Sequence, residues 1–126
     1  MLTSESTALL PVDLYQTELH LIWGEDLEYR VPRYRESLGL KPRRFPRGAV
    51  GVCFKVEQTA EGAWACVVAL GGWDSSSTAI GILVHELFHA VEAIMEFIGA
   101  KHCEKSSENW AYLLQDLTER ALDDML

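Results

Sequence analysis

The sequence His85-Glu86-Leu87-Phe88-His89 places two imidazoles and a carboxylate within one apolar segment, Ala79–Ile98. If this segment is helical, positions i and i+4 lie about 40° apart on one face, so both imidazoles can converge on a single metal ion. Glu86 then projects about 100° from His85, which lets it reach a metal-bound water without becoming a ligand. Two neutral nitrogen ligands beside a carboxylate base are what a zinc hydrolase requires. The pattern therefore predicts one Zn²⁺ ion held by His85 and His89, with Glu86 as the general base.

A catalytic zinc usually has a third protein ligand and an open position for water. The candidates downstream of the histidines are Glu92, Glu96, His102, Cys103, Glu104 and Glu108. Glu92 shares the helix face of the histidines but lies about 7 Å along the axis from their midpoint, and Glu96 about twice as far. Both therefore fit a position beside the ligands better than direct ligation. Glu108 would begin the next helix, and the nine-residue connection Gly99–Ser107 can span up to about 30 Å, enough to return towards the histidines. The residues alone leave the choice of third ligand open.

The pattern His85-Glu86-Leu87-Phe88-His89, eighteen intervening residues and then Glu108-Asn109-Trp110-Ala111 resembles the HExxH…ExxA arrangement of the gluzincin branch of zinc metallopeptidases. The chain is also similar to compact metallopeptidases encoded by phages and prophages. The resemblance covers roughly residues 72–117. It implies His85, His89 and Glu108 as zinc ligands and Glu86 as the general base. The chain departs from larger gluzincins in having Tyr112, not aspartate, four residues after Glu108, and in lacking the subdomain that forms the far wall of their cleft.

The expected reaction is hydrolysis of a peptide or protein substrate, with Glu86 taking a proton from the attacking water and delivering it to the leaving nitrogen. Tyr112 is a candidate donor to the developing oxyanion, with ordinary packing as its alternative. We expect an extended peptide to pair with Ala63–Leu70 as an edge strand. A second interpretation is a zinc-bearing binding or accessory protein of phage origin with weak or no activity. A third makes the motif accidental, with His85 and His89 as core histidines.

The chain of 126 residues has the length of a single domain, residues 1–126, and 48% of its residues are apolar, which suits a packed core. No apolar run is free enough of charge to predict a membrane span, and no secretory signal is visible. Three cysteines without C-x-x-C spacing favour reduced thiols in a cytoplasmic protein. The net charge is −8, yet seven of the eleven basic residues lie within Arg30–Arg47. This segment could contact an acidic partner, but its three prolines and few aromatic residues favour a solvated loop over a nucleic-acid site.

The order of elements predicts an α+β domain, with a small, mainly antiparallel sheet against a long HExxH helix and a C-terminal helix. The resemblance implies that this domain is a minimal zincin-like fold. The glycines and serines that flank Ala79–Ile98 fit helix ends, with Gly99 after the last turn. The remaining expected segments are a loose arm at Met1–Pro11, a strand at Asp13–Trp23, a short helix or irregular segment at Leu27–Leu40, a hairpin of Ala49–Val56 and Ala63–Leu70, and a final helix at Ser107–Asp124.

Overall fold

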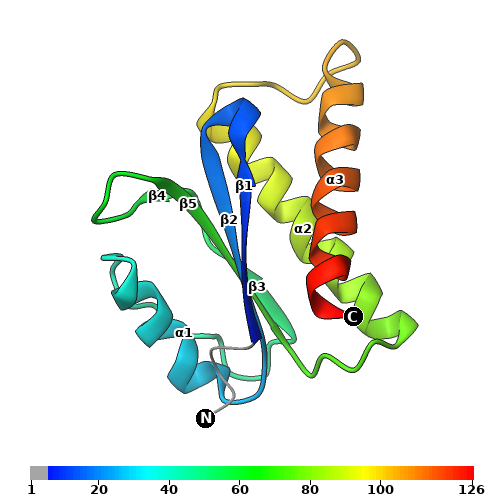
Figure 1. Cartoon of the computed structure of the whole chain (residues 1–126). Helices are drawn as coiled ribbons and strands as arrows, with labels where there is room; N and C mark the ends of the chain where they lie inside the picture. Colours follow the sequence, from blue (N-terminus) through cyan, green and yellow to red (C-terminus); the bar gives the residue numbers. More distant parts are fainter. Residues whose placement is uncertain (1–5) are drawn as a thin grey trace.

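An open, mixed sheet forms the centre of the protein, with one helix on one face and two helices on the other (Figure 1). The computed structural model describes residues 6–126. The elements in chain order are β1 (Thr7–Val12), the 3₁₀ turn η2 (Asp13–Tyr15), β2 (Thr17–Gly24), α1 (Leu27–Ser37), β3 (Gly51–Cys53), β4 (Glu57–Gln58), β5 (Trp64–Gly71), α2 (Ser77–Phe97) and α3 (Ser107–Met125). The predicted α+β class is confirmed.

The sheet has the order β1-β2-β5-β3, and β4 also pairs with β5. Among the strand pairings of residues 6–126, only β2–β5 is parallel, so the sheet is mainly antiparallel as predicted. The prediction that Ala63–Leu70 is an edge strand is wrong, because β5 lies between β2 and β3. Its six consecutive buried residues, from Ala65 to Leu70, are typical of a strand covered on both faces. The strand beside the HExxH helix that has an open edge is β3.

The N-terminal part of the described chain is also more ordered than predicted. Thr7–Val12 is strand β1 and pairs with β2 from Thr7↔Ile22 to Val12↔Thr17, so the loose-arm prediction is wrong for these residues. Residues 1–5 of the predicted arm lie outside the described residues. The predicted strand at Asp13–Trp23 is correct only from Thr17 onward. Because β1 and β2 form a hairpin, Asp13–Tyr15 must make the turn, which ends at Gln16 with a left-handed φ of 54°.

Helix α1 and the connection that follows it are tied to the sheet by a buried arginine. The helix spans Leu27–Ser37 and continues through Pro32. Arg35, fully buried near the helix end, donates from Nε to the carbonyl of Lys41 at 2.8 Å and from Nη2 to Glu57 at 2.7 Å. Its guanidinium also lies 4.6 Å from the centre of the Phe54 ring. These contacts hold the connection between α1 and β3 against the end of the sheet.

Helix α2 begins and ends close to the predicted bounds. The Ser76 hydroxyl accepts a hydrogen bond from the backbone N–H of Ala79 at 3.1 Å, and Gly99 takes a left-handed φ of 79° after the last turn. Its apolar face packs on the sheet and on α3, whose own buried stripe includes Leu113 and Leu117. By length and composition alone α2 could also cross a membrane, a test that buried helices of soluble proteins pass as well.

Candidate metal centre

His85 and His89 lie one helical turn apart on α2 with their rings exposed to solvent. Their Nε2 atoms are 3.2 Å apart. Two imidazole nitrogens bound tetrahedrally to zinc, each at about 2.0–2.1 Å, would be separated by about 3.3–3.4 Å. The pair therefore already has nearly the spacing of a chelate. Because both rings are exposed, the alternative of core histidines does not apply.

Glu92 orients one of these two rings. Its Oε1 lies 2.9 Å from Nδ1 of His89. When Nδ1–H donates to this carboxylate, the lone pair of the neutral ring is on Nε2, the atom that faces His85. A carboxylate that fixes a histidine tautomer in this way is the usual neighbour of a metal-binding imidazole. This contact agrees with the prediction that Glu92 lies beside the ligands and does not ligate the ion itself.

Glu86 points from α2 towards strand β3 and is the one buried acid of the described chain, with 7% of its surface exposed. Helical geometry puts it about 60° from His89 around the axis. A Cβ atom added to Gly51 would lie 2.8 Å from Cγ and 2.9 Å from Oε2 of Glu86, so the carboxylate occupies the space that a side chain at position 51 would take. No hydrogen bond from residues 6–126 engages the Glu86 oxygens. They are therefore available to a water molecule.

Glu108 is not brought to the histidines. Within residues 6–126, no three His, Cys, Asp or Glu side chains gather in a way that could hold a metal ion. Glu108 is exposed in the first turn of α3, nine residues before the fully buried Leu117. Nine residues correspond to about 900° of rotation, which puts Glu108 on the side of α3 opposite its buried stripe. The downstream candidates His102, Cys103 and Glu104 are exposed as well.

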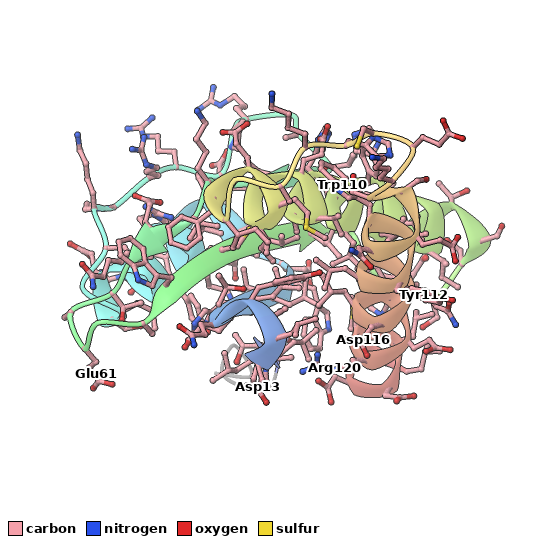
Figure 2. The ribbon with its side chains drawn as sticks, turned by 90° about the horizontal axis from the view of Figure 1, so that it is seen from above. Asp13, Glu61, Trp110, Tyr112, Asp116 and Arg120 are labelled. Atoms are coloured by element: carbon pink, nitrogen blue, oxygen red, sulfur yellow. The ribbon has the colours of Figure 1, made fainter. Side chains whose placement is uncertain are left out.

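Tyr112 lies on a different side of the molecule from Glu86. It is 62% exposed and borders a groove between α3 and the β1–β2 turn, at the sheet edge opposite β3. Figure 2 shows Asp116 and Arg120 of α3 beside Asp13 of this turn, with Trp110 nearer the N-terminal end of the helix. The expected role of Tyr112 as an oxyanion donor beside the histidines is therefore not supported by its position.

A second polar cluster lies on the α1 face of the sheet. His20 contacts the Tyr34 hydroxyl through Nδ1 at 2.6 Å and Glu18 through Nε2 at 2.5 Å. Burial lowers the pKa of His20, although its hydrogen bond with Glu18 opposes this effect. Burial also raises the pKa of Tyr34 to about 12. A neutral imidazole satisfies both contacts, donating to Glu18 and accepting from Tyr34, so the cluster fastens α1 to β2.

The sequence interpretation missed Gly51 as a residue of the site. A glycine inside a strand often marks a place where another group approaches the backbone closely, and this was the available signal. Which group approaches could not be known before β3 was placed beside α2.

Comparison of the chain with protein-family models, with curated proteins and with solved structures finds no match in any of the three. The interpretation of the centre therefore rests on the chemistry and geometry of its own residues.

Proposed function

We propose that the chain is a compact zinc-dependent peptidase in which His85 and His89 hold one Zn²⁺ ion and Glu86 is the general base. The observation that carries this proposal is the 3.2 Å separation of the two Nε2 atoms on the same helix as a buried carboxylate, Glu86, that has no hydrogen-bond partner among residues 6–126. The two rings lie at hydrogen-bond distance from each other, and the same spacing suits chelation of one ion. Proton transfer is a role that fits a buried acid with no hydrogen-bond partner among residues 6–126.

Each residue has a definite part in the reaction. When bound, zinc would supply Lewis acidity, which lowers the pKa of a coordinated water and polarises a peptide carbonyl. Glu86 accepts the proton of the attacking water on a carboxylate oxygen, while the water oxygen bonds to the carbonyl carbon. The same proton then passes from Glu86 to the leaving nitrogen as the peptide bond breaks. Glu92 keeps His89 in the tautomer whose Nε2 lone pair is free.

The proposed third ligand is Glu108, which the HExxH…ExxA resemblance implies. For Glu108 to reach the ion, the first turn of α3 has to change its direction. Two features favour such a change. Ser106 precedes the helix without a side-chain capping bond, and residues 107–109 are all exposed.

Metal content tests the centre directly. Protein purified without a histidine tag, stripped by a chelator and titrated with Zn²⁺ should bind about one equivalent, as a single-ion site requires. His85→Ala should abolish this binding, whereas His102→Ala, which removes an exposed histidine stacked on Trp110, should not. Less than about half an equivalent, unaffected by His85→Ala, would exclude the zinc centre.

Cleavage tests the reaction separately from the metal. With a fluorescently labelled mixture of unfolded proteins as substrate, Glu86→Gln should retain zinc and lose cleavage. A zinc-bearing binding protein is the second candidate, favoured by the failure of a third ligand to gather with the histidines in residues 6–126. That candidate predicts bound zinc but no cleavage by the wild-type protein.

A further inference from the structure

The outer edge of β3 is open to a further strand. Phe54 donates from its backbone N–H to the carbonyl of Val67 at 2.9 Å, and Val50 accepts from Gly71 at 3.0 Å. The alternation of an antiparallel ladder therefore directs the N–H and C=O groups of Gly51 and Cys53 away from β5. Within residues 6–126 no other strand pairs with this edge. An extended peptide can bond to it through its main chain.

This edge leads into a basic groove of about 850 Å³. Cys53–Glu57 form one wall, and Pro42–Arg44 of the connection after α1 form the other. Arg43, Arg44 and Lys55 are exposed, and in the part of the chain that the structure describes none of them pairs with a carboxylate.

Among residues 6–126, the only carboxylate in the lining belongs to Glu57, which accepts a hydrogen bond from Arg35 at 2.7 Å. The groove is therefore locally positive in a protein of net charge −8. Figure 2 shows nitrogen-tipped side chains along the connection between α1 and β3, on the side of the molecule away from Asp13.

The groove and the candidate metal centre are neighbours along one strand. Gly51 contacts Glu86, and Cys53 in the groove wall follows two residues later, about 7 Å along the strand. On β3, Gly51 and Cys53 face α2, whereas Val52 and Phe54 pack on the α1 side. Side chains of a peptide paired with β3 would alternate in the same way, some towards Glu86 and the others towards the arginines.

We propose that this groove selects acidic peptide segments, which bind along β3 with carboxylates directed to Arg43, Arg44 and Lys55. That such a segment is a substrate rests on the proposed peptidase function, whereas the binding of the segment to the groove does not depend on that function. A peptide is favoured over a nucleic acid because the strand edge offers main-chain donors and acceptors that match another strand. A phosphate backbone would use the cations alone.

Fluorescence anisotropy with the Glu86→Gln protein measures binding without cleavage. The probes are two labelled octapeptides of valine and serine that carry four glutamates or four glutamines at alternate positions. At low salt the glutamate peptide should bind about tenfold more tightly, because each of three exposed ion pairs contributes a factor of about two. Arg43→Glu/Arg44→Glu should remove this preference. The matched control Lys101→Glu/Lys105→Glu makes the same change of charge in the exposed loop after α2 and should keep it.

Several outcomes would overturn the proposal. Equal affinity for the two peptides would do so, and so would loss of the preference in both double variants, because net charge would then explain it. An oligonucleotide of equal charge that binds as tightly as the glutamate peptide would also overturn it, in favour of a general polyanion surface. If the arginine variant fails to give the native circular dichroism spectrum, Arg43→Gln/Arg44→Gln takes its place.

Failure of this proposal can be told apart from failure of the peptidase proposal. Zinc stoichiometry and Glu86-dependent cleavage of an unfolded protein do not depend on the groove and would persist without acidic selectivity. Conversely, a protein that binds no zinc could still prefer the glutamate peptide.

Discussion

Replacing Gly51 with alanine tests whether the position of the Glu86 carboxylate matters to the reaction. The new Cβ would lie 2.8 Å from Cγ of Glu86, whereas ordinary contacts begin at 3.4 Å, so the side chain must withdraw by about 0.6 Å. Gly51 does not have a left-handed φ, so alanine fits its backbone. The flexible end of Glu86 can move more easily than the strand. Because a 1 Å misplacement of a catalytic group can cost about 100-fold in rate, we expect a roughly tenfold loss of kcat.

The zinc affinity of Gly51→Ala should stay within about twofold of wild type, since the space beside Gly51 is occupied by Glu86 and not by the histidines. The assays are steady-state cleavage of a labelled unfolded protein and zinc competition against a chelating dye. Gly81→Ala is the matched control, because a Cβ at Gly81 in α2 meets open space. It should keep full activity and stabilise the helix by about 0.5–1 kcal/mol. Unchanged kcat in a folded, zinc-loaded Gly51→Ala protein would refute the reasoning, and so would its unfolding.

Three further predictions concern Glu92 beside the centre, His20 on the α1 face and Tyr112 at the opposite sheet edge. Glu92→Ala should weaken zinc binding about 10- to 100-fold in a dye competition assay because His89 loses its orienting partner, whereas Glu96→Ala, one turn further on, should not. Burial lowers the pKa of His20, so below pH about 6.5 the unfolded chain binds more protons than the folded one, and the free energy of unfolding should fall as pH decreases from 7 to 5. Urea titrations should show this slope in the wild type and a smaller one in His20→Gln. Tyr112→Phe should leave both zinc binding and cleavage unchanged, because this side chain lies over the opposite sheet edge.

Local signals in the sequence were enough to predict α2 and the geometry of its motif. The apolar run, the serines before it and Gly99 after it give the helix bounds, and the i and i+4 spacing gives the convergence of His85 and His89. The contact between Glu92 and His89 follows from the same periodicity. All of these relations lie within one helix, where backbone geometry alone determines which side chains meet.

Relations between distant segments could not be predicted in the same way. The parallel pairing of β2 with β5 joins residues more than forty positions apart, and it is this pairing that makes β5 central and leaves β3 at the edge. Strand β1 was not predicted because it contains Pro11, whose nitrogen cannot donate a hydrogen bond to a neighbouring strand. The proline is tolerated because β1 is the other edge of the sheet. The unbroken apolar run of β5 was a usable signal for a central strand.

For Glu108 the helical periodicity of α3 and the family resemblance disagree. The periodicity places this side chain opposite the buried stripe of α3, whereas the resemblance implies that it is a zinc ligand. Turning the first helical turn of α3 towards α2 would break three or four backbone hydrogen bonds, at a net cost of about 2–6 kcal/mol. Zinc binding to a complete ligand set contributes on the order of 10 kcal/mol, so the rearrangement is energetically accessible. We therefore expect zinc to change amide hydrogen exchange at residues 107–110 in the wild-type protein and not in Glu108→Ala, with Glu104→Ala behaving as wild type. Identical exchange with and without bound zinc would remove Glu108 from the ligand set and leave a centre of two histidines.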